Sequence, residues 1–177
     1  GASLQHLTAL QTLDLSHNEL RAEGSRALGA SLLQHLSALR ALNLSENWLG
    51  VEGVTALATP LRHLTALQTL DLSRNHLGDD GVEALGASLQ HLTALQTLDL
   101  SHNELRAEGS RALGASLLQH LSALRALNLS ENWLGVEGVT ALATPLRHLT
   151  ALQTLDLSRN HLGDDGVEAL GASLQHL

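Results

Sequence analysis

An internal duplication constrains this sequence more than any other feature. Residues 1–85 recur without a substitution as residues 86–170, and residues 171–177 begin a third copy. Gene duplication in nature leaves copies that diverge, so identity over 85 residues indicates a very recent event or a designer. We therefore expect an engineered tandem array of an 85-residue module.

A shorter period lies inside each module. The string L-x-x-L-x-L-x-x-N-x-L-x-x-x-G-x-x-x-L recurs at steps of 28 or 29 residues, beginning at Leu10, Leu39, Leu67, Leu95, Leu124 and Leu152. Such a period is typical of a solenoid, in which neighbouring units bury each other's apolar faces. The sequence predicts one solenoid domain of six repeats over residues 1–177. The three units of a module differ at many positions, which favours a natural three-repeat block that was later copied.

Each unit has a strand pattern followed by a helix pattern. Leu13, Asp14 and Leu15 alternate as in a strand with one buried face, and Asn18 follows where the chain must turn. Four residues then recur at the spacing of one helical face: Gly24, Leu28, Leu32 and Leu36. The predicted unit is strand, turn, helix and return loop.

Three residue types locate the helices more closely. Asp79-Asp80-Gly81 is expected to open the third helix, since acidic side chains stabilise the positive end of the helix dipole. Gly24 and its equivalents are expected to permit close packing where each helix begins. Pro60 and Pro145 stand late in the second helix of each module, where we expect the ring to break or kink the helix.

Stacking such units predicts an α/β horseshoe. Strands lie about 4.8 Å apart in a sheet, whereas packed helices need about 8–10 Å. The difference is taken up as curvature, on the order of 20° per repeat for layers about 10 Å apart. The parallel sheet is therefore expected on the concave face and the helices on the convex face.

The repeated string resembles the leucine-rich repeat, and the 28/29-residue length with a full helix resembles the ribonuclease-inhibitor subfamily. This subfamily includes the repeat regions of intracellular immune receptors, and the likeness covers residues 8–177. It implies a structural ladder whose amides bond backbone groups of the turn and of the neighbouring repeat: Asn18, Asn47, Asn75, Asn103, Asn132 and Asn160. Members normally carry distinct capping repeats, and the sequence contains none.

Composition narrows the classes of function. A formal charge of −8 argues against a nucleic-acid partner, which usually needs a basic face. The absence of Cys excludes disulfides and thiolate metal sites and suits a cytosolic-type ancestor. No stretch of about 18 apolar residues could span a membrane. Neither a signal peptide nor an initiating Met is present, which suits a recombinant product and leaves the compartment unknown.

Two arrangements imitate chemical sites. One His per repeat forms a ladder near the helix C-termini: His6, His35, His63, His91, His120, His148 and His176. A metal is disfavoured there, because zinc–nitrogen bonds of about 2.0–2.1 Å cannot join ligands on helices about 8–10 Å apart. Asp14, Ser16 and His17 carry the residue types of a hydrolase triad, but Glu46 or Arg74 replaces the His in other repeats. We expect no catalysis, no metal and no cofactor.

The variable positions on the sheet face and its rim form the candidate binding surface. Strand alternation sends Thr12, Asp14 and Ser16 to the concave side. The candidate residues are Asp14, His17, Glu19, Asn43, Glu46, Trp48, Asp71, Arg74, His76, Asp99, His102, Glu104, Asn128, Glu131, Trp133, Asp156, Arg159 and His161. Each module contributes four acids and one Arg to this set, a charge that would steer basic partners toward it.

Trp48 and Trp133 are the only aromatic residues of the chain. They occupy equivalent rim positions three repeats apart, about 14 Å by strand spacing. Exposed Trp is frequent at binding hot spots. The alternative is that each ring packs on neighbouring rim residues and covers surface.

Two functions follow from these features. The first is a building block whose uncapped, self-complementary ends associate, because repeat six ends like repeat three and repeat one begins like repeat four. Residues 1–7 and 171–177 share one sequence and would compete for one place in such a junction. The second is a protein-binding domain that recognises a basic partner on its acidic concave face.

Overall fold

The computed structural model describes residues 6–31 and 33–175. Each repeat contributes one three-residue strand to a six-stranded parallel sheet with the order β1-β2-β3-β4-β5-β6. The strands are β1 (Thr12–Asp14), β2 (Ala41–Asn43), β3 (Thr69–Asp71), β4 (Thr97–Asp99), β5 (Ala126–Asn128) and β6 (Thr154–Asp156). The predicted strand pattern is confirmed in every repeat.

One helix follows each strand and packs beside the helix of the next repeat. The helices are α1 (Arg21–Ser31), α2 (Gly50–Leu61), α3 (Gly78–Leu89), α4 (Ala107–His120), α5 (Gly135–Leu146) and α6 (Gly163–Leu174), with a short 3-10 helix η2 (Leu33–His35) after α1. Within the described residues, every helix is too short or too polar to cross a bilayer.

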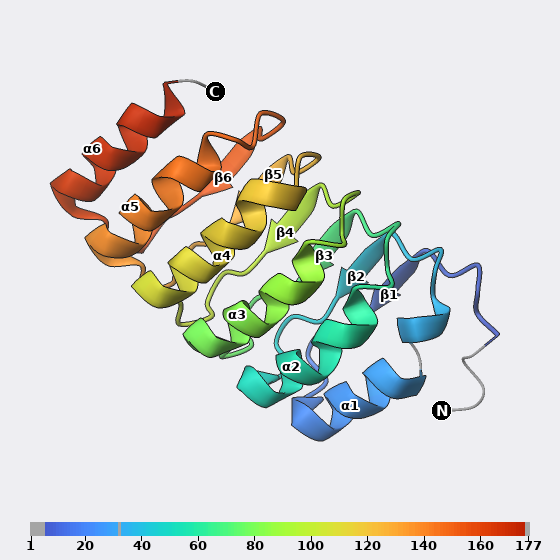
Figure 1. The fold of residues 1–177 in the computed structure, drawn as a ribbon. Helices are drawn as coiled ribbons and strands as arrows, with labels where there is room; N and C mark the ends of the chain where they lie inside the picture. Colours follow the sequence, from blue (N-terminus) through green and yellow to red (C-terminus); the bar gives the residue numbers. More distant parts are fainter. Residues whose placement is uncertain (1–5, 32, 176–177) are drawn as a thin grey trace.

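Curvature follows from the unequal widths of the two layers. The helices line one side of the stack and the strands the other, and the row of helices spans a visibly longer arc than the row of strands (Figure 1). The sheet therefore forms the concave face and the helices the convex face of an α/β leucine-rich-repeat horseshoe. The β1 and β6 ends lie at opposite ends of the stack (Figure 1).

The core consists of leucines at equal heights in successive repeats. The strand register pairs Leu13 with Leu42, Leu42 with Leu70 and so on to Leu155 without a slip. Leu70 and Leu98 in the middle of the stack are fully buried. Leu13 and Leu155 at its two ends are only partly buried. Burial of a leucine side chain is worth about 1.5–3 kcal/mol, so central repeats hold the stack together.

The asparagine ladder bonds neighbouring repeats at the turn after each strand. The Asn47 side chain donates to Leu15 O at 2.7 Å and Leu44 O at 3.0 Å, and its Oδ1 accepts from Asn18 N at 3.0 Å. Asn47, Asn75, Asn103, Asn132 and Asn160 are buried, whereas Asn18 is exposed. These amides satisfy backbone groups that would otherwise be buried without partners.

Two local predictions are wrong. The expected break is absent: Pro60 and Pro145 lie inside α2 and α5, which have 12 residues each, like the proline-free α3. The Pro60 ring packs over Gly29 of α1. The second error concerns Leu36, which lies beyond η2 rather than on α1, although it is fully buried. Leu32 of the same predicted face lies outside the described residues.

Candidate functional site

The strands carry a row of carboxyl and amide side chains on the concave face. Its members are Asp14, Asn43, Asp71, Asp99, Asn128 and Asp156. Each Oδ1 accepts from the backbone amide of the serine two residues later at 2.9–3.0 Å. The Asn128 side chain also donates to Asp99 Oδ2 at 2.9 Å. The row is therefore held in fixed geometry by the turns that end the strands.

Hydrogen bonding keeps two of these carboxyl groups ionised. The backbone amide of Ser16, and then its hydroxyl, hold the pKa of Asp14 below its usual range. The Ser158 amide and hydroxyl do the same for the pKa of Asp156. A carboxylate that accepts several bonds favours its charged form.

A first rim row follows the strands. It consists of His17, Glu46, Arg74, His102, Glu131 and Arg159, which all adopt a positive φ between 53° and 56°. The left-handed conformation costs an ordinary residue about 1–2 kcal/mol. Backbone bonds to the next repeat offset the cost, as in His17 N to Ser45 O at 3.0 Å and Arg74 N to Ser101 O at 3.0 Å.

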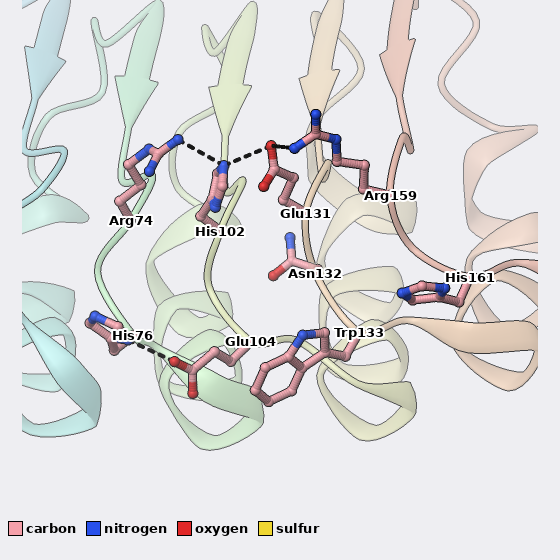
Figure 2. A pocket seen from close by; sticks show the side chains of 9 residues that line it. All are labelled: Arg74, His76, His102, Glu104, Glu131, Asn132, Trp133, Arg159 and His161. Atoms are coloured by element: carbon pink, nitrogen blue, oxygen red, sulfur yellow. Dashed lines mark hydrogen bonds and ion pairs between the residues drawn. The ribbon is translucent and has the colours of Figure 1, made fainter.

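Side chains of the first rim row contact one another across all six repeats. His17 Nδ1 lies 3.1 Å from Glu46 Oε2, and Arg74 Nε lies 3.7 Å from Glu46 Oε1. Arg74 Nη2 then lies 2.9 Å from His102 Nε2. His102 Nε2 and Arg159 Nη1 both approach Glu131 Oε1, at 3.1 and 3.0 Å (Figure 2). The acids of this row are therefore paired within the row.

A second rim row lies two residues further along each loop, toward the helices. Its members are Glu19, Trp48, His76, Glu104, Trp133 and His161. His76 Nδ1 lies 2.7 Å from Glu104 Oε1, and the His76 ring meets Trp48 edge-on at 6.3 Å between centroids. Trp48 and Trp133 remain 59% and 53% exposed. Arg21 and Arg106 approach the two indole rings at 5.9 and 5.2 Å.

Residues of repeats three to six line an open pocket of about 390 Å³ between the two rim rows. Figure 2 shows Arg74, His102, Glu131 and Arg159 along one side and His76, Glu104, Trp133 and His161 along the other. The structure thus brings eight predicted surface residues into one site. Trp48 lies elsewhere, beside a groove of about 500 Å³ with Leu49 and Val51.

Sequence reasoning missed two exposed arginines at the start of the strands. Arg40 and Arg125 directly precede β2 and β5 and are exposed. With Arg40 counted beside Arg74, each module sets two arginines against the four acids Asp14, Glu19, Glu46 and Asp71. The residue directly before each strand varies between repeats, and counting this position would have identified both arginines. The face is less acidic than the sequence count predicts.

The side chains of the triad-like set and of the histidine ladder do not form catalytic or metal sites among the described residues. Ser16 Oγ donates to Asp14 Oδ1 at 2.7 Å, and His17 pairs with Glu46, so Asp14, Ser16 and His17 do not form a relay. Among residues 6–31 and 33–175, no three His, Asp or Glu side chains gather as metal ligands. His176 of the histidine ladder lies outside the described residues.

Comparison with known families agrees with the repeat geometry. A leucine-rich-repeat family profile matches six segments, residues 5–29, 35–58, 63–86, 90–114, 120–143 and 148–171, which together cover most of the chain. The chain belongs to the leucine-rich-repeat family. A search of curated protein sequences finds no match to this leucine-rich-repeat protein.

Solved structures share its fold. The tropomodulin C-terminal domain of Caenorhabditis elegans is similar with a TM-score of 0.63 and 11% identity, covering 98% of this chain and 87% of that one. A leiomodin-1 structure, described as actin-binding site 2, has a TM-score of 0.57 and 19% identity, covering 71% of this chain and 72% of that one. Identities this low establish a common fold for these leucine-rich-repeat proteins and nothing further.

Proposed function

We propose that this leucine-rich-repeat protein is a non-catalytic recognition scaffold that binds another protein through its concave face and rim. The observation that carries the proposal is the exposure of Trp48 and Trp133, at 59% and 53%, on loops whose backbones are tied to neighbouring repeats. Rigid, exposed Trp loses little conformational freedom on binding and is frequent at hot spots. The leiomodin-1 fragment, described as an actin-binding site, gives a precedent for protein binding on this fold.

Electrostatics favour a basic partner over a nucleic acid. The net charge of the chain is −8, and Asp14, Asp71, Asp99 and Asp156 line the strands. Hydrogen bonds from serine keep the pKa of Asp14 and of Asp156 low, so these carboxyls stay charged in mildly acidic solution. The exposed Arg40 and Arg125 weaken this field without reversing it. Basic partners are therefore steered to the concave face.

A peptide-display experiment tests recognition. A phage-displayed peptide library is panned on the immobilised chain, and each enriched peptide is measured against the Trp48→Ala/Trp133→Ala variant. We expect Lys- and Arg-rich peptides whose affinity falls about tenfold or more in the variant and decreases with added salt. An unchanged unfolding midpoint is the control. Acidic peptides, or equal affinity for both proteins, would contradict the proposal.

A second candidate is the engineered building block, assembled from a ribonuclease-inhibitor-like module by tandem duplication. Leu155, Leu157 and Leu162 at the β6 end are only partly buried, although their module counterparts Leu70, Leu72 and Leu77 are fully buried. A second copy of the chain that presents its first repeat would cover them as repeat four covers repeat three. Such a head-to-tail contact forms a ring or a filament.

Solution mass measurements test this association. Light scattering over a concentration series of the 177-residue chain should show a rising mass, and Leu155→Glu should lower it. A strictly monomeric mass at high concentration removes the building-block function and leaves recognition standing.

A further inference from the structure

Repeats one and four have the same sequence but different backbones at the start of the helix. Arg21 adopts a left-handed φ of 52°, whereas Arg106, 85 residues later, is extended with φ −117° and ψ −160°. Glycine stands at this position in the other four repeats, as Gly50, Gly78, Gly135 and Gly163, always with a positive φ. The left-handed conformation is costly for arginine but not for glycine, so an arginine at this position is stabilised by leaving it.

A carboxylate from the preceding repeat supplies that alternative. Asp79 Oδ1, in the first turn of α3, accepts from Arg106 N at 2.8 Å and from Gly109 N at 2.9 Å. The first turn of a helix has unpaired backbone amides. Asp79, which belongs to repeat three, thereby caps α4 of repeat four. A Cβ on Gly109 would collide with this carboxylate, so glycine is required for its approach. In repeat one, Arg21 N donates instead to Asn47 O at 3.0 Å.

The tryptophan loop of the following repeat also differs between the two modules. Arg106 N donates to Asp79, and a bond between repeats four and five runs from Trp133 N to Leu105 O at 2.8 Å. Trp48 has a φ of +57°, whereas Trp133 does not adopt a positive φ. Trp133 borders the polar pocket between the rim rows, and Trp48 borders a groove with Ala22, Leu49 and Val51.

We propose that Asp79 is a positioning residue that converts two tryptophan loops of identical sequence into two recognition sites of different specificity. In the Trp133 site, Glu131 is shared with Arg159, and Arg106 already approaches the indole ring. These paired charges suit a polar segment of a partner protein that exchanges hydrogen bonds with them. The Trp48 site offers aliphatic neighbours, which suit an apolar side chain. This inference rests on the proposed recognition function, but the positioning step itself needs no partner to be measured.

Single-tryptophan chains measure the positioning step. In a Trp48→Phe chain, the indole 1H–15N signal and the emission maximum report on Trp133 alone, and a Trp133→Phe chain gives the reference for Trp48. We expect the two references to differ. Asp79→Ala in the Trp48→Phe chain should shift the Trp133 signal toward the Trp48 reference, whereas Asp79→Asn, which keeps the accepting oxygen, should leave it in place.

The duplication supplies matched controls. Asp164 holds the same module position as Asp79, at the start of α6, so Asp164→Ala should leave the Trp133 signal unchanged. Gly109→Ala should displace the Asp79 carboxylate and reproduce the shift. Gly24→Ala should not, because the three atoms nearest to its Cβ position belong to the Leu20 side chain rather than to a capping carboxylate. Circular dichroism and urea midpoints verify that each chain is folded.

Three results would overturn the inference. They are coincident signals for the two tryptophans, an unchanged Trp133 signal in folded Asp79→Ala and Gly109→Ala chains, and an equal shift in Asp164→Ala. Failure of the peptide-display experiment with a successful shift would reject recognition while leaving the positioning role of Asp79 intact.

Discussion

Asn75 connects two repeats through both ends of its side-chain amide. Its Nδ2 donates to Leu44 O of repeat two at 2.9 Å and to Leu72 O of its own repeat at 3.0 Å. Its Oδ1 accepts from Asn47 N at 3.0 Å. All of these groups are buried, so water cannot replace the hydrogen bonds that are lost when the Asn75 side chain is removed.

Asn75→Ala should therefore lower the free energy of unfolding by about 2–3 kcal/mol, the cost of leaving buried polar groups unpaired. Asn18→Ala is the matched control, because Asn18 is exposed at the β1 end of the ladder and water can replace its bonds to Leu15 and Ser16. Urea unfolding followed by circular dichroism measures both. Equal losses would show that burial does not set the strength of the ladder.

Asp156 should make stability depend on pH in acid. Its folded pKa is held below the unfolded value, first by the Ser158 amide and then by the Ser158 hydroxyl. The stabilisation is present above the unfolded pKa, about 3.9, and is lost as the pH falls through the folded pKa. Asp156→Asn keeps the acceptor, as Asn43 and Asn128 do. The variant should lose less stability below about pH 4 in urea titrations; an identical pH profile would reject this.

At the scale of elements, the spacing of neighbouring helices depends on where a glycine of one helix faces the proline ring of the next. Gly29 of α1 and Gly171 of α6 stand in the same string, Ala-Leu-Gly-Ala-Ser. A Cβ on Gly29 would lie 2.7 Å from Pro60 Cγ and 3.2 Å from Ala56 O, whereas a Cβ on Gly171 would meet nothing within 4 Å. The neighbouring helix, rather than the local sequence, decides what each glycine does.

Gly29→Ala should lower the unfolding free energy by about 1–3 kcal/mol, because a rigid ring cannot move aside without strain. Gly171→Ala should raise it by about 0.5–1 kcal/mol through the helix propensity of alanine. Thermal and urea unfolding of both variants give the comparison. Adding Pro60→Ala to Gly29→Ala should recover part of the loss, and the absence of any recovery would contradict the contact.

At the scale of the whole molecule, position in the stack decides what a residue contributes. Leu70 and Leu155 occupy the same site of the two modules, with the same flanking sequence over many residues. Leu70 is fully buried between two neighbouring repeats, whereas Leu155 has one neighbour in the sheet and stays partly exposed. Stability in a solenoid is a sum over nearest-neighbour interfaces.

Leu70→Ala should cost about 2–5 kcal/mol, the range for a buried leucine that leaves a cavity. Leu155→Ala should cost about half of that or less, because it loses contacts on one side only. Unfolding in urea measures both values under identical conditions. A larger loss for Leu155 would mean that the β6 end is covered in solution, and the mass of the chain would then have to be remeasured.

The sequence by itself determined the repeat, the strands, the helices and the stacked leucines. It could do so because each repeat contacts only its neighbours, so a one-dimensional period specifies a three-dimensional stack. It also identified the rim residues, including Trp48 and Trp133. It missed the exposed Arg40, because only the strand and the turn after it were counted.

Only the tertiary structure decided how identical segments differ. Asp79 was understood from the sequence as a helix-dipole residue, which it is, but its carboxylate also caps α4 and sets the backbone of Arg106. Arg21, with the same flanking sequence, donates its backbone N–H to Asn47 O instead and adopts the left-handed conformation. Local sequence fixes which conformations are open to a residue, and contact with the preceding repeat selects among them because it supplies the missing acceptor.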